Sequence, residues 1–213
     1  MSSPNYKTIR GYGQAGLDIS KSQFIAFADQ VETEEQALRF ISSIKQHHPA
    51  ANHHCTAYIT GRHDQHQRAD DDGEPSGTAG KPILEVIKKH QLKNTAIVVV
   101  RYFGGIKLGT GGLIRAYGKA AGAAIEAAGI TEKSLHCRMA IDLSYVLLGK
   151  IENFINTHAL PVENKEFSDT VRIIALFPKN RRGDIMKTLT ELTAGQAGFT
   201  LLDEVYRDFT PDP

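Results

Sequence analysis

The sequence predicts an α+β protein of two domains, the second of which has a ferredoxin-like arrangement. Segments with strand-like and helix-like hydrophobic patterns alternate along the 213 residues, and the pattern begins again after residues 131–135. In the second half the segments follow the order strand, helix, strand, strand, helix, strand, which is the ferredoxin-like order. We therefore expect domains at residues 1–135 and 136–208, followed by a tail at 209–213.

In the first half, the clearest helix signal is the capping-box pattern from Thr33 to Gln36, with Thr33 as N-cap and Gln36 reaching back. The residue before Pro49 avoids the α region, so this helix ends near His48. Pro82 suits the first turn of another helix. Strands are predicted at 22–31, 52–60 and 95–100, helices at 34–47, 82–90 and 113–128, and a hairpin tip or long loop at 61–80.

The second half repeats these patterns over shorter segments. Apolar residues at helical spacing predict two helices whose inward faces carry Ile151, Phe154, Ile155 and then Ile185, Leu189, Leu192. The strands are predicted at 138–147, 162–167, 170–177 and 199–205, and the helices at 149–158 and 180–192.

Residues 94–129 form the central stretch: an apolar strand buried on both faces, a glycine loop at 104–112 and an alanine-rich helix. Gly118 and Gly122 in that helix indicate that it lies close against a sheet, where larger side chains would clash, because glycine otherwise costs about 1 kcal/mol there. The predicted inward face consists of Ile114, Tyr117, Ala121, Ala124, Ile125 and Ala128.

The charge pattern predicts an anion site on the same stretch. No acidic residue occurs between Glu85 and Glu126. A glycine loop that enters a helix also presents backbone N–H groups at the positive end of the helix dipole. We expect a phosphate to bind here, on a nucleic acid or a small molecule; the alternative is a tight turn with solvated lysines. The cations of this window are Lys88, Lys89, Lys93, Arg101, Lys107, Arg115 and Lys119.

The acidic run at residues 70–74 has two interpretations. Asp70, Asp71, Asp72 and Glu74 could hold Mg²⁺ through carboxylate oxygens, or they could cap turns in a solvated loop, which we favour. Ser76 and Thr78 either cap the helix that begins at Lys81-Pro82 or donate hydrogen bonds to a phosphate; capping is the favoured role.

Two further side-chain groups are weighed. His53 and Cys55 share one face of a strand and could form a nucleophile with its base or part of a metal site, but most such pairs are structural. Tyr102 and Phe103 point to opposite faces where the strand ends. One of them is therefore expected to close the core and the other to stack on a base.

Composition limits the class of protein. Two cysteines do not make a disulfide framework and fit a reducing compartment. The N-terminus lacks the pattern of a signal peptide, and no apolar run approaches the roughly 20 residues that span a bilayer. We expect a cytoplasmic protein that contacts no membrane and holds no cofactor or metal.

Two long stretches resemble the signature of the IMPACT family, in its bacterial YigZ-like branch. Residues 71–84 read DDGEPSGTAGKPIL, and residues 100–117 read VRYFGGIKLGTGGLIRAY. The resemblance covers nearly the whole chain. It implies that residues 1–135 form a domain similar to the second domain of ribosomal protein S-five. It also implies that residues 136–208 resemble the last, ferredoxin-like domain of elongation factor G.

The family resemblance implies a translational regulator without an established catalytic residue set. We therefore predict a non-enzymatic factor that binds RNA or a ribosomal surface, with a protein of the translation machinery as a further partner. The alternatives are an enzyme acting on a phosphorylated small molecule or nucleotide with Mg²⁺, and a protein-binding adaptor that uses the acidic second domain. The predicted anion or nucleic-acid site is Arg101, Tyr102, Gly104, Gly105, Lys107, Gly109, Thr110, Gly111, Gly112, Arg115 and Lys119. Asp71, Asp72, Glu74, Ser76, Thr78 and Lys81 are predicted to contribute from the acidic loop.

Overall fold

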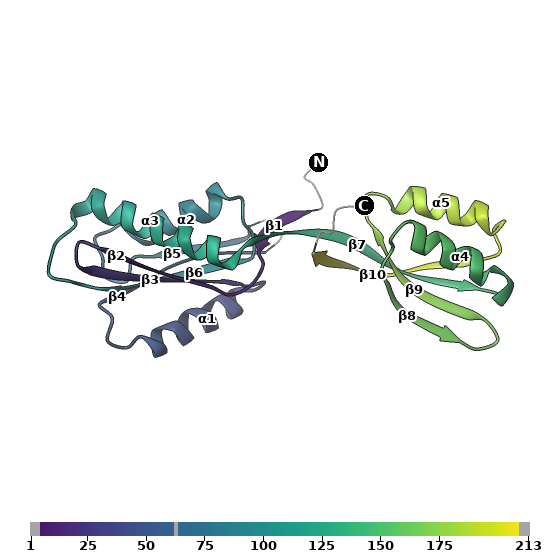
Figure 1. Ribbon diagram of the computed structural model, residues 1–213, viewed down its shortest axis with the longest axis horizontal. Coiled ribbons are helices and arrows are strands. Elements are labelled where there is room, and N and C mark those ends of the chain that lie inside the picture. Colours follow the sequence, from purple (N-terminus) through teal and green to yellow (C-terminus); the bar gives the residue numbers. More distant parts are fainter. Residues whose placement is uncertain (1–4, 62–63, 209–213) are drawn as a thin grey trace. The chain divides into compact units, whose positions relative to one another are not determined.

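The computed structural model describes residues 5–61 and 64–208, and the predicted tail at 209–213 lies outside them. The chain divides into two compact units (Figure 1). We call Tyr6–Glu132 the N-terminal unit and the residues from Lys133 onward the C-terminal unit. Both units combine helices with an antiparallel sheet, so the predicted two-domain α+β fold is confirmed.

The N-terminal unit is a five-stranded sheet with helices on both faces. The strand order is β2-β3-β6-β4-β5, and every neighbouring pair is antiparallel. Helix α1 covers one face, and α2 with α3 cover the other (Figure 1). The elements are β1 (Tyr6–Ile9), β2 (Gly13–Ile19), β3 (Ser22–Gln30), α1 (Glu34–His47), β4 (His53–Thr60), β5 (His66–Asp70), α2 (Gly80–Lys89), β6 (Thr95–Tyr102) and α3 (Gly109–Ala128).

The central strand β6 is buried on both faces, as its apolar sequence predicts. Ile97 and Val99 join the core under α2 and α3, whereas Val98 and Val100 pack on the side of α1. At the start of α1, Thr33 accepts a hydrogen bond from Gln36 N. The Gln36 side chain reaches back to Glu32 N rather than to the Thr33 amide that the capping box predicts.

The C-terminal unit has the predicted ferredoxin-like order. Its strands lie in the order β10-β7-β9-β8, which places the first and third strands of the motif at the centre. Two helices pack their apolar faces on the sheet through Ile151 and Leu189. The elements are β7 (Ile130–Leu143), α4 (Tyr145–Thr157), β8 (Val162–Phe167), β9 (Val171–Pro178), α5 (Arg182–Leu192) and β10 (Gly198–Asp208).

Several local predictions are wrong. Helix α3 begins at Gly109 rather than at Leu113, so the last three glycines of the predicted loop belong to its first turn. Ile114 is 42% exposed and lies outside the inward face, and Leu192 is 36% exposed. For residues 61–80, predicted as a hairpin tip or a long loop, the structure shows the hairpin, since β5 pairs with β4.

The predicted reason for the glycines of α3 is also wrong. A Cβ at Gly122 would have no atom within 4 Å, and one at Gly118 would reach only Val86 at 3.9 Å. The close approach of helix and sheet occurs instead at Gly13 of β2. A Cβ there would lie 2.3 Å from Ala128 N and 2.6 Å from Ala124 O, both of which are backbone atoms of α3.

Gly13→Ala is therefore expected to destabilise the protein by about 1–3 kcal/mol, because backbone atoms must move to admit the methyl group. Urea unfolding of the full chain measures this loss. Gly16→Ala is the matched control, since it lies in the same strand and its Cβ would meet nothing within 4 Å. Equal stability of the two variants would contradict this packing.

Candidate anion-binding site

The two family-like sequence stretches meet in one pocket of the N-terminal unit, which we call the motif pocket. Its volume is about 470 Å³, and it opens to solvent. It is surrounded by residues from the loop between β5 and α2, which we call the acidic loop, and from the end of β6, the glycine loop and the start of α3. The lining residues are Asn52, His53, Glu74, Pro75, Arg101, Phe103, Lys107, Leu108, Gly109, Thr110 and Leu113.

An ion pair lies at the wall of the motif pocket. Arg101 Nη1 donates to Glu74 Oε1 at 2.7 Å, and the same oxygen accepts from Tyr117 Oη at 2.7 Å. Arg101 Nη2 lies 3.3 Å from Ser22 Oγ. Both charged side chains are buried, with 6% and 3% of their surface exposed. Arg101, predicted to contact phosphate, therefore has its charge compensated inside the protein.

The remaining acidic-loop carboxylates are also used within the protein. Asp71 accepts hydrogen bonds from Gly77 N, Ala79 N and Gly80 N at 2.7–3.0 Å, so it caps the amino end of α2. Asp72 accepts from His54 N at 2.7 Å and from Lys45 Nζ at 3.1 Å. With Glu74 paired to Arg101, each of these three carboxylates has protein donors in place of a metal ion.

The predicted capping role of Ser76 and Thr78 is wrong. Thr78 Oγ1 donates to Pro75 O at 2.6 Å, and Ser76 is exposed. The cap comes from Asp71, which precedes the first helical residue by nine positions and reaches it because the loop folds back. Lys81 lies exposed in the first turn of α2.

Asp71 makes stability depend on pH. Burial alone would raise the pKa of its carboxyl group, but the N–H donors of Gly77, Gly80 and Ala79 outweigh burial and lower that pKa. A lowered folded-state pKa stabilises the fold above the unfolded value of about 3.9, and the contribution disappears as the pH falls through the folded-state pKa.

Asp71→Asn is expected to lower the free energy of unfolding by about 1–2 kcal/mol at neutral pH, as for other lost helix caps. It should also flatten the loss of stability on acidification, because the titrating group is gone. Urea midpoints across an acidic pH series measure both effects. Ser76→Ala is the control and should keep the wild-type values. If Ser76→Ala lowered the free energy of unfolding more than Asp71→Asn, Ser76 rather than Asp71 would be the cap of α2.

The glycine loop is shorter than predicted, because it spans residues 103–108 between β6 and α3, and it packs tightly where it leaves β6. A Cβ at Gly104 would lie 1.8 Å from Lys21 O in the β2–β3 turn, so only glycine fits. Gly105 and Gly109 have φ angles of +85° and +68°, which other residues rarely adopt. The glycines therefore hold the loop in one shape and start α3 beside the pocket.

The amino end of α3 faces solvent with its donors open. Leu108 at the N-cap makes no side-chain cap hydrogen bond to any part of the chain that the structure describes, and the first turn holds no acidic residue. Gly109, Thr110 and Gly111 are exposed. These backbone N–H groups are at the positive end of a 20-residue helix, where an anion binds favourably.

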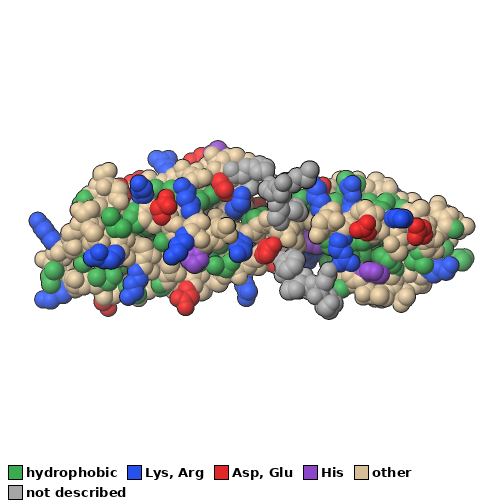
Figure 2. All heavy atoms as spheres, turned by 90° about the horizontal axis from the view of Figure 1, so that it is seen from above, with side chains coloured by type: hydrophobic (Ala, Val, Ile, Leu, Met, Phe, Trp, Pro, Cys, Tyr) green, Lys and Arg blue, Asp and Glu red, His purple; other side chains and the backbone are tan. Residues whose placement is uncertain are grey.

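Three exposed cations lie at this helix end and along α3, with Lys107 just before the helix and Arg115 and Lys119 within it, and we call these three residues the basic patch. Arg115 folds back over the first turn, since its Nη1 lies 3.6 Å from the Cβ position of Gly111. Within residues 5–61 and 64–208, none of the three forms an ion pair. Figure 2 shows Lys and Arg side chains spread over the α2–α3 face of this unit.

Tyr102 and Phe103 divide the two predicted roles between them. Tyr102 packs with the α1-side core, and its hydroxyl lies 2.9 Å from His48 Nδ1. Phe103 is 44% exposed and lines the motif pocket, with the Arg101 guanidinium 5.3 Å from its ring centroid. Phe103 is therefore the aromatic side chain available for stacking.

Placement of the predicted site residues follows from these contacts. Lys107, Gly109 and Thr110 line the pocket, while Arg115 and Lys119 extend along α3 next to it. The exposed members are Gly105, Lys107, Gly109, Thr110, Gly111, Arg115 and Lys119; Tyr102, Gly104 and Gly112 are half-buried, and Arg101 is buried. In the acidic loop, Asp71 and Asp72 are half-buried and Glu74 and Thr78 are buried.

The residue pattern does not indicate a role for Asn52, and it relates His53 to Cys55 rather than to this pocket. Asn52 Oδ1 accepts from Phe103 N at 2.8 Å. His53 lines the pocket, and its Nδ1 lies 2.9 Å from Asp72 O. The antiparallel pairing of His53 with Arg101 brings these residues together, and no local sequence signal indicates that register.

Cys55 has the structural role that the sequence favours. It is fully buried, and its Sγ donates to Asp71 O at 3.1 Å. Burial raises the pKa of the thiol to about 12. The reactive thiolate is therefore negligible at neutral pH, and Cys55 is not an activated nucleophile.

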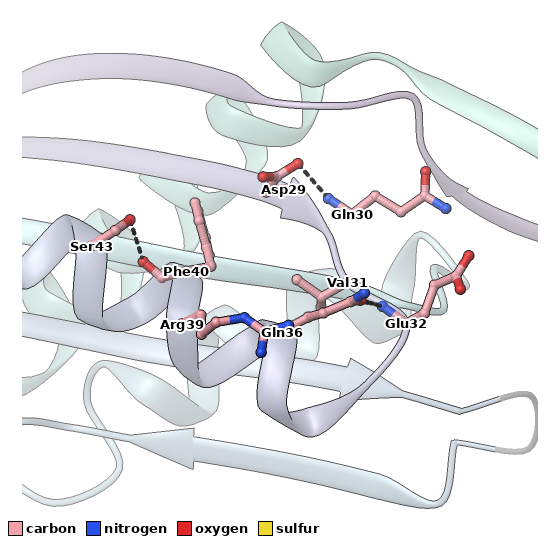
Figure 3. A pocket seen from close by; sticks show the side chains of 8 residues that line it. All are labelled: Asp29, Gln30, Val31, Glu32, Gln36, Arg39, Phe40 and Ser43. Atoms are coloured by element: carbon pink, nitrogen blue, oxygen red, sulfur yellow. Dashed lines mark hydrogen bonds between the residues drawn. The ribbon is translucent and has the colours of Figure 1, made fainter.

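A second pocket of about 650 Å³ lies between the end of β3 and α1 (Figure 3). Its polar groups bond to one another: Gln30 N donates to Asp29 Oδ1, Glu32 N to Gln36 Oε1, and Ser43 Oγ to Phe40 O. No residue of either sequence stretch lines it, so it does not belong to the predicted site.

Two kinds of feature are absent from the described ranges. No group of three or more His, Cys, Asp or Glu side chains is placed there to hold a metal ion. None of the helices in these ranges combines the length and apolar character needed to cross a bilayer.

Comparisons with known proteins agree with the fold and with the two sequence stretches. Residues 20–125 match the family model for the Impact N-terminal domain, and residues 141–196 match a domain of unknown function, DUF1949. A solved structure titled as a hypothetical protein is 28% identical, with a TM-score of 0.63 over 95% of this chain and 99% of that chain. The fold is thus that of a two-domain protein with an Impact-type first domain.

Curated relatives give the family. IMPACT family member YvyE of Bacillus subtilis is 43% identical over 193 residues, which are 91% of this chain and 89% of that protein. IMPACT family member YigZ of Escherichia coli is 32% identical over 189 residues, 88% of this chain and 93% of that protein. The chain belongs to the IMPACT family, as its motifs predict.

Proposed function

We propose that the protein is a non-enzymatic, translation-associated factor of the cytoplasm that binds RNA, free or on a ribosomal surface. The binding site is the motif pocket together with the basic patch. The observation that carries this proposal is the convergence of two separate sequence stretches on one pocket at the open amino end of α3.

The charges around the pocket support an anionic ligand. Lys107, Arg115 and Lys119 are exposed, whereas Glu74, a carboxylate that lines the pocket, is buried and paired with Arg101. A phosphate at the helix end would therefore meet Lys107 and the helix dipole, and Arg115 and Lys119 lie farther along α3 for further phosphates. The line of Arg115 and Lys119 along one face of α3 suits a polymer with several phosphates better than a single small anion.

The Mg²⁺-dependent enzyme alternative has less support. It needs carboxylates that are free to hold a metal, whereas Asp71, Asp72 and Glu74 already accept hydrogen bonds from α2, Lys45 and Arg101. No single observation favours the protein-binding adaptor over RNA. RNA-binding and thermal-shift measurements distinguish the enzyme and the adaptor from the RNA-binding factor.

The proposal is tested by fluorescence anisotropy with a short labelled single-stranded RNA. Each phosphate contact contributes about 0.7 log unit of affinity at 0.1 M salt, so Arg115→Ala with Lys119→Ala should weaken binding roughly 25-fold. The control is Lys150→Ala with Lys187→Ala, which removes two exposed cations from the C-terminal unit and should leave affinity unchanged. Equal affinities of the two double variants would contradict the site.

The same preparation separates the alternatives in a thermal-shift assay with nucleotides and Mg²⁺. Stabilisation by one nucleotide, without RNA binding, would favour the enzyme. If the protein neither binds RNA nor is stabilised by a nucleotide, the proposal is overturned and the protein-binding adaptor is the remaining alternative.

A further inference from the structure

We propose that the motif pocket takes one unstacked nucleotide of the bound strand, with its base against Phe103 and its phosphate beside Lys107 at the amino end of α3. This inference rests on the proposed function and adds a substrate class to it. The bound nucleic acid is single-stranded at the pocket, because a duplex keeps its bases stacked inside.

The pocket has an apolar wall and a cationic end. Pro75, Leu108 and Leu113 line it together with Phe103, while Lys107 and the amides of α3 lie at its edge. A base has two apolar faces and a nucleotide carries its charge at one end, so the ligand and the pocket match in chemistry. Its volume of about 470 Å³ also lies within the usual range for small-ligand sites.

Phe103 is held in place for stacking. Its ring is 44% exposed, and the Arg101 guanidinium lies over it at 5.3 Å from the centroid. Its backbone N–H donates to Asn52 Oδ1 at 2.8 Å, and the next residue, Gly104, is fixed against Lys21 O. A stacking surface that is already ordered loses little conformational entropy when a base binds.

One polar group in the wall of the pocket lacks a hydrogen-bond partner among the described residues. Arg101 is only 5% exposed, yet its Nε has no hydrogen-bond partner within the described residues. A buried donor without a partner is costly, so a polar ligand atom there would be stabilising. Nε is buried in the pocket wall, so a ligand atom would bond to it only after a shift of the Arg101 side chain.

His53 presents an acceptor to the pocket. Its Nδ1 lies 2.9 Å from Asp72 O, and because a carbonyl only accepts, Nδ1 carries the proton in the neutral ring. Nε2 is then an acceptor, with Glu74 Oε1 3.9 Å away. An N–H group on the edge of a base can donate to this nitrogen, which gives the pocket a means of orienting the base.

The test compares a short single-stranded RNA with a blunt duplex of the same length. The wild-type protein should prefer the single strand by about tenfold or more, and Phe103→Ala should lose that preference by weakening only single-strand binding. Ile106→Ala is the matched control, since Ile106 is also 44% exposed in the same loop but does not line the pocket.

A second variant gives a direct signal and does not depend on the loss of a side chain. The chain contains no tryptophan, so Phe103→Trp introduces a single indole. Stacking of a base on that indole should quench its fluorescence on titration with single-stranded RNA and not with the duplex.

The outcomes separate the two proposals. Equal affinity for single strand and duplex, lost in both cases when Arg115 and Lys119 are replaced, would overturn the nucleotide pocket and leave the proposed function standing. A Phe103→Trp protein that binds the single strand while its fluorescence stays unquenched would also overturn the pocket. A wild-type protein that binds neither RNA overturns both proposals.

Discussion

Arg101→Met is expected to destabilise the N-terminal unit by about 3–5 kcal/mol, because it leaves the Glu74 carboxylate buried without its cation. Among the described residues, Tyr117 Oη would remain as a hydrogen-bond donor to Glu74. The variant also removes the guanidinium from the rings of Phe24 and Phe103, each 5.3 Å away. Urea unfolding of the full chain measures the loss.

Arg115→Met is the matched control for this change. It removes the same type of side chain from an exposed position on α3 and should change stability by less than about 0.5 kcal/mol. If Arg101→Met were as stable as Arg115→Met, the buried pair would not hold the end of β6 to the acidic loop.

Thr110→Glu is expected to separate stability from binding. Thr110 is exposed in the first turn of α3, where a carboxylate stabilises the helix dipole by about 0.3–1 kcal/mol. The same carboxylate would repel a bound phosphate. Two unit charges 4 Å apart interact by about 4 kcal/mol at an effective dielectric constant of 20, so RNA binding should fall by roughly 1,000-fold.

Thr110→Gln is the neutral control of nearly the same shape, and it should bind RNA within about threefold of wild type, a change below about 1 kcal/mol. Anisotropy titrations and thermal melts of both variants test the pair of effects. A Thr110→Glu protein that binds RNA as well as Thr110→Gln would show that the amino end of α3 does not meet phosphate.

The sequence predicts the elements well because their signals are local. The apolar run of β6 and the Thr33 cap of α1 depend on residues a few positions apart, and the structure confirms both. The ferredoxin-like order of the second half is predicted for the same reason, since each strand and helix pattern is contiguous in the chain.

The contacts that decide the site are long-range, and the sequence does not reveal them. The residue pattern predicts that Arg101 binds a phosphate and that Glu74 binds a metal. In the structure the two side chains form an ion pair with each other, although they are 27 positions apart in the sequence. Asp71 caps α2 because the loop folds back, and Gly13 rather than Gly118 meets the neighbouring backbone. In each case the partner is fixed by strand pairing or loop shape, which residue types alone do not specify.

The most direct measurement is a two-dimensional ¹H–¹⁵N NMR titration of the labelled full chain with short single-stranded RNA. The account predicts the largest shifts at the amides of Phe103, Lys107 and residues 109–112, with smaller shifts near Arg115 and Lys119. Shifts confined to residues 133–208, with the first turn of α3 unchanged, would contradict it.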